Sequence, residues 1–164
     1  MTLLLFQYVL PAAYDVLPPE MQSDEASAML MAIALQESEC SHRRQQPHGP
    51  ARGFWQFEAH GGVVGVLRHP ITGPLARRAL VALCYSTSLT ARDIHALIEH
   101  NDTVAAVWAR LLLWTVRGAL PGPENPNEGW RQYLSGWRPG RPRPATWNGN
   151  FTRAWALIDT GEDT

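Results

Sequence analysis

Residues 23–38 read Ser23-Asp-Glu-Ala-Ser-Ala-Met-Leu-Met-Ala-Ile-Ala-Leu-Gln-Glu37-Ser38, and they carry the strongest helix signal in the chain. Ser23 is a capping residue, and the two acids that follow it suit the positive end of a helix dipole. Apolar side chains then recur at helical spacing, at Ala26, Met29, Leu30, Ile33 and Ala34. The pattern predicts an amphipathic helix from about Ser23 to Cys40.

Glu37 takes the next position on the apolar face of this helix. A carboxylate is costly to bury in its charged form, so burial is expected to raise the pKa of Glu37 and keep the group protonated. General acid catalysis near neutral pH requires such a carboxyl group. The plain alternative is a partly exposed glutamate without a chemical role, as Glu39 on the opposite face is expected to be.

A second segment, Ala51-Arg-Gly-Phe-Trp-Gln56-Phe, follows the predicted helix. Together, Gln36-Glu37-Ser38 and Gly53-Phe54-Trp55-Gln56 resemble the lysozyme-like superfamily, and within it the lytic transglycosylases and goose-type lysozymes. The whole chain is also similar to a group of phage-associated proteins of that kind. The resemblance is carried by residues 29–45, 49–67 and 130–155, and the close motif match covers about a quarter of the chain.

The resemblance implies an all-α, single-domain lysozyme-like fold that cleaves peptidoglycan between N-acetylmuramic acid and N-acetylglucosamine. Glu37 would be the catalytic residue, acting first as an acid and then as a base. Ser38 and Gln56 would orient Glu37 and the substrate, whereas Phe54 and Trp55 would stack on a sugar or pack in the core. The implied partners are a glycan strand and other phage virion or lysis proteins. No cofactor is implied.

A glycosidase that uses water needs a second carboxylate about 5–10 Å from the first. By residue type the candidates are Glu58, Asp93 and Asp102, with Glu58 considered first, but none lies in a recognisable second-acid motif. In the lytic transglycosylases that the chain resembles, one glutamate suffices because the sugar's own 6-hydroxyl attacks in place of water. The sequence therefore favours a transglycosylase that yields a 1,6-anhydro product.

One segment departs from the family pattern. The family has Ala-Tyr-Asn-x-Gly, whose tyrosine approaches the catalytic glutamate, whereas this chain has an apolar run from Val104 to Gly118. Trp108 or Trp114 is expected to fill the space of the missing tyrosine. Two alternatives therefore stay open. One is a catalytically degenerate module that builds a virion or binds the wall, and the other is an unrelated helical bundle in which Glu37 is a paired core acid.

The composition excludes several classes of protein. The 164 residues are 45% hydrophobic and 18% charged with a net charge of −1, which excludes a disordered chain and gives no overall basic field for nucleic acid. All 14 basic residues are arginine. The 6 histidines lack metal-ligand spacing, so no metal is expected. Cys40 and Cys84 are expected as free thiols or as one bridge.

The N-terminal residues are apolar, but they show neither the basic start nor the cleavage site of a signal peptide. No stretch approaches the roughly 20 apolar residues that span a bilayer. We therefore expect a protein without a signal peptide or membrane insertion. It would reside in the cytoplasm of the producing cell or in a virion, and would act on the cell wall.

Hydrophobic periodicity predicts a single domain over residues 1–164 that is built from helices. The first helix is expected to kink or break at Pro11. The helix over residues 102–117 is the most apolar and is expected at the centre of the fold. Helices are expected over 3–17, 23–40, 63–68, 74–86, 91–99, 102–117, 130–137 and 147–159, with loops at 18–22 and 41–52 and a frayed tail at 160–164.

Overall fold

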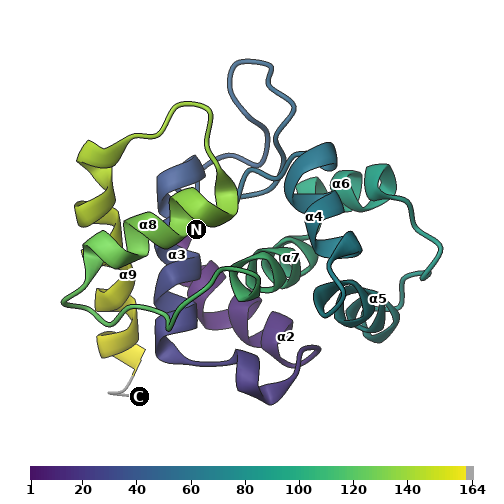
Figure 1. The fold of residues 1–164 in the computed structure, drawn as a ribbon, viewed down its shortest axis with the longest axis horizontal. Helices are drawn as coiled ribbons and strands as arrows, with labels where there is room; N and C mark the ends of the chain where they lie inside the picture. The colour runs from purple at the N-terminus through teal and green to yellow at the C-terminus, as the bar shows by residue number, and fades with distance from the viewer. Residues whose placement is uncertain (162–164) are drawn as a thin grey trace.

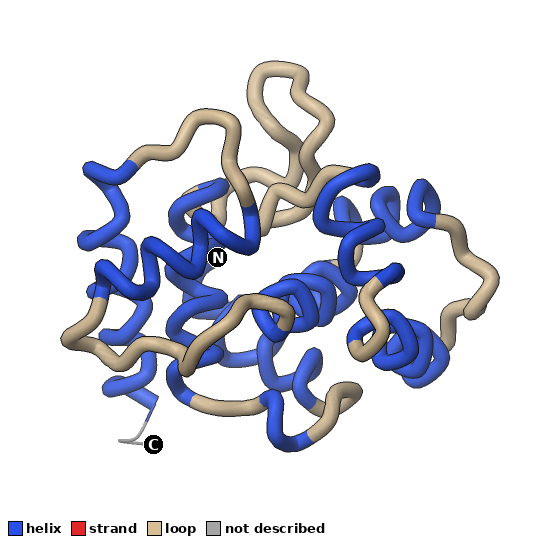
Figure 2. The backbone as a smooth tube through the Cα atoms, in the orientation of Figure 1, coloured by secondary structure: helices blue, strands red, loops and turns tan. Residues whose placement is uncertain are grey.

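The computed structural model describes residues 1–161, and this part of the chain is all-α, with no strand (Figures 1 and 2). The all-α character predicted from the sequence is thereby confirmed. In chain order the elements are α1 (Thr2–Leu4), the π-helix η1 (Leu5–Val9), α2 (Leu10–Tyr14), the 3-10 helix η2 (Pro19–Met21), α3 (Asp24–Ser38), the π-helix η3 (Ala59–Val63), α4 (Val64–Arg68), α5 (Thr72–Ala82), α6 (Ala91–His100), α7 (Asp102–Trp114), α8 (Pro126–Trp137) and α9 (Pro144–Gly161).

Helix α3 forms where the sequence predicts it. The Ser23 side chain caps its first turn by accepting a hydrogen bond of 3.1 Å from the Ala26 N–H. The helix ends at Glu39, whose φ of 53° lies in the left-handed region that closes helices. Between these ends, residues 28–36 are all buried. The helix that carries Glu37 is therefore held on nearly every side by the core.

Helix α7 is the second helix enclosed by the core. The Asn101 side chain caps it by accepting a hydrogen bond of 3.0 Å from the Val104 N–H, and residues 104–113 are all buried. This burial confirms that the most apolar helix lies at the centre, although it ends at Trp114 rather than at residue 117. Apolar burial on this scale is the main term that stabilises such a fold.

The N-terminal η1 and α2 pack against α7, and most of the other helices form two groups on either side of it (Figure 1). Helix α9 packs most extensively against α3, and α8 lies against α9. On the other side, α4, α5 and α6 each contact α7. Figure 2 shows two long loops at one end of the molecule, formed by residues 41–52 and by the α8–α9 connection. Both loops reach the site described below.

Ion pairs attach the loop of residues 41–52 to α6 and α7. The Arg43 guanidinium donates two hydrogen bonds to the Asp102 carboxylate, from Nε at 2.8 Å and from Nη2 at 2.6 Å. Arg44 and Arg52 both pair with Glu99, at 2.7 and 2.8 Å. Two-pronged arginine–carboxylate contacts fix geometry as well as charge, so they hold this loop in one place.

The structure corrects several predicted boundaries. The first helical segment ends at Tyr14, and its interruption at Pro11 takes the form of the preceding π-helix, whose wider turn accommodates the proline ring. Residues 18–22 were expected to be a loop, but Pro19–Met21 forms a 3-10 turn. Helices α8 and α9 begin earlier than predicted, at Pro126 and Pro144, because proline suits the first position of a helix.

The loop of residues 41–52, the C-terminal tail and the two cysteines can also be compared with the sequence-based predictions. The loop over residues 41–52 is irregular, with isolated antiparallel bridges joining Arg44 to Arg52 and Arg52 to Phe57. In the predicted frayed tail, residues 160 and 161 are helical, and residues 162–164 lie outside the described part. Cys40 is buried, Cys84 is exposed, and both are free thiols. Among residues 1–161, no helix has both the length and the apolar character needed to cross a membrane.

Candidate active site

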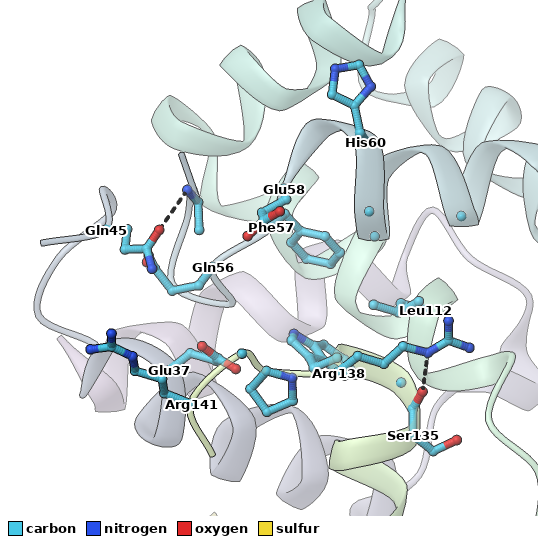
Figure 3. Close-up of a pocket in the computed structure, with 18 of the residues that line it drawn as sticks. Glu37, Gln45, Gln56, Phe57, Glu58, His60, Leu112, Ser135, Arg138 and Arg141 are labelled. Carbon is cyan, nitrogen blue, oxygen red and sulfur yellow. Dashed lines mark hydrogen bonds between the residues drawn. The ribbon is translucent and has the colours of Figure 1, made fainter. Parts of the chain in front are cut away.

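A pocket of about 1160 Å³ lies where the two groups of helices and both long loops meet. Glu37, at the end of α3, lines this pocket together with Gln56 and Glu58 from the segment before η3. The C-terminal turns of α7 and α8 complete its walls. Figure 3 shows the carboxyl group of Glu37 on one wall and the side chains of Gln56 and Glu58 on another.

Glu37 combines access to the pocket with substantial burial. Its Oε1 accepts a hydrogen bond of 2.7 Å from the hydroxyl of Tyr133. Burial raises the pKa of Glu37, and this effect outweighs the hydrogen bond from Tyr133 and the positive charge of Arg143, which both lower it. The side chain thus keeps its proton to a higher pH than an exposed glutamate does, as its position on the apolar face predicts.

Tyr133, in α8, holds its hydroxyl in place through its aromatic neighbours. Its ring stacks on Trp147, with centroids 5.3 Å apart and planes 12° apart, and it lies 5.2 Å from the ring of Trp130. Burial and the neighbouring Glu37 both raise the pKa of Tyr133, so the phenol remains a hydrogen-bond donor. A donor fixed in this way favours the charged form of Glu37 whenever the glutamate loses its proton.

The aromatic residue beside Glu37 comes from α8, whereas the sequence predicted Trp108 or Trp114 of α7 in that place. Trp108 is fully buried in the core, and Trp114 lies under the Arg110 guanidinium at 5.0 Å. Neither residue lines the pocket, and the side chain that contacts Glu37 is Tyr133. The sequence-based reasoning missed Tyr133, although a signal was present. Trp130, Tyr133, Leu134 and Trp137 form an apolar stripe at helical spacing, and a tyrosine buried on such a stripe requires a partner for its hydroxyl.

Ser38 is buried at the end of α3 and does not line the pocket. It is 1% exposed, and its Oγ lies 3.1 Å from the carbonyl oxygen of Ala34 and 2.8 Å from that of Phe54. Its hydroxyl can therefore donate within α3 or to the segment that follows Gly53. This contact joins the end of α3 to that segment, so the predicted role in orienting Glu37 fits its location, whereas direct contact with a ligand does not.

Phe54 and Trp55 also lie in the core, at 1% and 0% exposure. The Trp55 indole donates a hydrogen bond of 2.8 Å to the carbonyl oxygen of Leu30, and the Arg43 guanidinium lies 4.4 Å from the centre of the Phe54 ring. Neither ring is free to stack on a sugar, so of the two roles predicted for them only packing remains. They anchor the turn that presents Gln56.

Gln56 is brought into the pocket by a tight turn between Arg52 and Phe57. Arg52 and Phe57 exchange backbone hydrogen bonds of 2.9 and 2.8 Å. The Gln56 side-chain amide donates a hydrogen bond of 2.7 Å to the carbonyl oxygen of Gly53. Gly53 has a φ of +72°, and a Cβ there would lie 2.8 Å from Ile98 Cγ2. Glycine is required at this position for both reasons.

The candidates for a second acid are separated by the fold. Glu58 lines the pocket and is exposed, whereas Asp102 is held by Arg43 and Asp93 forms the capping box of α6 with Thr90. Among residues 1–161, no group of three His, Cys, Asp or Glu side chains is placed to hold a metal ion. The carboxyl groups that line the pocket are those of Glu37, with its Tyr133 partner, and of Glu58.

Comparison of the chain with protein-family models, with curated proteins and with solved structures found no match. What the site can do is therefore inferred from its own residues. They are a carboxyl group whose pKa is raised, a tyrosine donor fixed against it, and an open pocket in front of it.

Proposed function

We propose that this protein is a peptidoglycan-cleaving glycosidase of the lytic transglycosylase type. It would cut the β-1,4 bond between N-acetylmuramic acid and N-acetylglucosamine, with Glu37 as its catalytic residue. The observation that carries the proposal is a partly buried Glu37 with a raised pKa that lines the pocket while Tyr133 holds one of its oxygens. The motif resemblance around Glu37 and Gly53 supplies the substrate class.

In the first step Glu37 acts as a general acid. Because Oε1 accepts the hydrogen bond from Tyr133, the acidic proton is best placed on Oε2. Glu37 transfers that proton to the glycosidic oxygen as the bond to the muramic acid C1 breaks through an oxocarbenium-like state. The carboxylate left behind is stabilised by the Tyr133 hydroxyl, which favours the charged form.

In the second step the same carboxylate acts as a base. It removes the proton of the 6-hydroxyl of the muramic acid residue, and that oxygen bonds to C1 on the same sugar. The product carries a 1,6-anhydro ring, and Glu37 regains its proton, so no water is consumed. One carboxyl group that cycles between acid and base satisfies the requirements of both steps.

Two features of the pocket support this reaction type. Asp102 pairs with Arg43, and Asp93 caps α6 with Thr90. Besides Glu37, the one carboxyl group among the pocket's lining residues is that of the exposed Glu58. The pocket's volume, about 1160 Å³, lies just above the range of about 300–1,000 Å³ for small-molecule sites and suits more than one sugar ring. The similarity to phage-associated proteins favours wall cleavage during phage entry or host lysis.

Mass spectrometry of the fragments released from purified bacterial sacculi tests the proposal. Wild-type protein should release muropeptides one water lighter than hydrolysis products, and Glu37→Gln should release none. Glu39→Gln is the matched control, because Glu39 is exposed at the same helix end and does not line the pocket. Reducing-end products would instead indicate hydrolysis. A lack of release by wild-type protein from several wall types would favour a wall-binding or virion structural module.

A further inference from the structure

The pocket has a positively charged rim beside Glu37. Arg138, Arg141 and Arg143 line it, and all three come from the loop of residues 138–143 between α8 and α9. The other acid in the lining is Glu58, and the remaining titratable side chains there are His42, His60 and His69. A chain with a net charge of −1 therefore concentrates positive charge at its pocket.

These three arginines differ from the others near the site in having no acidic partner. Within residues 1–161, the side-chain ion pairs are those of Arg43, Arg44, Arg52 and Arg131. Arg138, Arg141 and Arg143 belong to none of them. No ion pair within the described residues therefore neutralises their positive charges, and Arg143 is the one whose charge also acts on Glu37.

The loop of residues 138–143 is held in place next to Glu37. The Gln36 side chain donates a hydrogen bond of 2.9 Å to the carbonyl oxygen of Arg143, and the Arg143 guanidinium donates to the carbonyl oxygen of Gln36. At the other end of the loop, Arg138 is the C-terminal cap of α8 and has a φ of 49°. Its Nε donates a hydrogen bond of 3.3 Å to the carbonyl oxygen of Ser135. In Figure 3, Arg141 and Arg138 extend to opposite sides of Glu37.

We propose that this arginine loop binds carboxylate groups of the peptide stem carried by the glycan, so that the preferred substrate is a stem-bearing, acidic strand. The inference rests on the proposed function and narrows its substrate. A guanidinium group remains charged at all relevant pH values and can bind a carboxylate with two parallel hydrogen bonds. Arg138 and Arg141 are the two recognition residues, because Arg138 donates to Ser135 from Nε and keeps its two Nη groups for a ligand, whereas Arg143 is tied to Gln36 through Nη2.

The position of the loop favours a stem over other wall anions. The bond that Glu37 would break starts at C1 of muramic acid, and this is the sugar that carries the stem. A strand placed for cleavage therefore brings a stem close to Glu37 and to the loop beside it. A phosphate-bearing wall polymer offers similar charge, but if it is joined to the 6-hydroxyl of that sugar it blocks the ring closure proposed above.

A binding experiment in the inactive Glu37→Gln background tests the inference without cleavage. Soluble glycan strands with intact stems are compared with strands whose carboxylates have been converted to neutral amides with carbodiimide and an amine. A third sample is freed of phosphate polymers with hydrofluoric acid. The added changes are Arg141→Gln alone, Arg138→Gln with Arg141→Gln, and Arg78→Gln as a control with the same charge change, since Arg78 is exposed and does not line the pocket.

The Kd for intact strands should rise about tenfold in the double arginine variant, a few-fold in Arg141→Gln, and less than twofold in Arg78→Gln. Amidated strands should bind all variants equally weakly, and removal of phosphate should change nothing. Equal binding of intact and amidated strands, or equal weakening by Arg78→Gln, would overturn the inference. Binding that is lost on phosphate removal alone would reassign the anion and also overturn it.

The outcomes separate the inference from the proposed function. If wild-type protein releases no fragments but the arginine-dependent preference for acidic strands is present, the glycosidase proposal fails and the anion site stands. If anhydro fragments are released equally well from intact and amidated strands, the glycosidase proposal stands and the arginine loop has no role in recognition. Melting temperatures of the variants within about 3 °C of wild type exclude misfolding as the cause.

Discussion

The Tyr133 hydroxyl donates a hydrogen bond of 2.7 Å to Oε1 of Glu37, although the two residues are 96 positions apart in the chain. The bond joins the end of α3 to the middle of α8 and gives one carboxyl oxygen a fixed partner. It also opposes the effect of burial, because burial raises the pKa of Glu37 and a donor to the charged form lowers it. The acidity of Glu37 is thus set by a balance between the two.

Tyr133→Phe should shift this balance toward the protonated acid. Removing the donor raises the pKa of Glu37, so the fall in kcat/KM at alkaline pH should move to higher pH. Below that limb, kcat should fall about tenfold, because the carboxylate formed during the reaction loses its donor. The pH profile of glycan cleavage measures both effects. A profile with an unchanged alkaline limb would contradict the role assigned to Tyr133, and Tyr85→Phe, outside the pocket, is the control.

Glu37→Gln should change how stability depends on pH. Since burial raises the pKa of Glu37, the folded state holds the proton more tightly than the unfolded chain does. The stabilisation from Glu37 is then complete below the unfolded pKa, about 4.3, and is lost as pH rises through the folded pKa. The variant should match wild type near pH 4 and melt at a higher temperature at alkaline pH. Thermal unfolding at both pH values checks this, and a less stable variant at alkaline pH would be inconsistent with a buried acid.

Helix α3 and the burial of Glu37 were predictable because both depend on local signals. A capping serine, two acids and apolar spacing are sufficient to place the helix, and the same spacing puts Glu37 on the inward face. The aromatic residues were less predictable. Phe54 and Trp55 next to a glycine are compatible with stacking or with packing, and only the tertiary fold shows that they are buried.

Tyr133 and the arginine loop depend on contacts between distant parts of the chain. The angle at which α8 crosses α3 decides whether the Tyr133 hydroxyl reaches Glu37, and no local pattern specifies that angle. For this reason the sequence predicted the aromatic neighbour of Glu37 in α7, whereas the structure places it in α8. The Pro/Arg loop was recognisable as a loop, but its attachment beside Glu37 depends on Gln36, a single buried polar side chain.

Gly53→Ala should destabilise the fold by about 2 kcal/mol, because Gly53 has a positive φ and a Cβ would lie 3.0 Å from the Ile98 carbonyl oxygen. For a protein of this size that corresponds to a fall in Tm of roughly 4–8 °C. Gly149→Ala is the control, since Gly149 lies within α9 with no atom near its missing Cβ, and it should stabilise slightly. Equal Tm values for the two variants would show that the turn tolerates a side chain.

Gln36→Ala should weaken the attachment of α9 and of the arginine loop. The Gln36 Oε1 accepts hydrogen bonds from Thr146 Oγ1 at 3.0 Å and from the buried Asn150 Nδ2 at 2.9 Å, and its Nε2 donates to the carbonyl oxygen of Arg143. Leaving Asn150 without a partner should cost about 1–3 kcal/mol in urea unfolding.

The matched control for this change is Thr146→Ala. It removes the hydroxyl of an exposed side chain, which lies 3.0 Å from Gln36 Oε1 and 3.1 Å from the carbonyl oxygen of Arg143, and should cost less than about 1 kcal/mol. Amide hydrogen exchange should also become faster at the start of α9 in Gln36→Ala, because the segment loses its anchor to α3. Unchanged exchange there would mean that packing alone holds the loop.

Glu58→Gln separates the two possible reactions of the pocket. If the sugar's own 6-hydroxyl attacks, Glu58 has no chemical role, so the variant should keep its cleavage rate within about threefold and release the same anhydro products. If water attacks, a second carboxylate is needed, and Glu58 is the other carboxyl group among the pocket's lining residues. A loss of about a hundredfold, with reducing-end products from the wild-type protein, would therefore identify Glu58 as the base and the enzyme as a hydrolase. Mass spectrometry of the released muropeptides identifies the product as anhydro or reducing-end. The rate of muropeptide release by Glu58→Gln, compared with wild type, shows whether Glu58 takes part in the reaction.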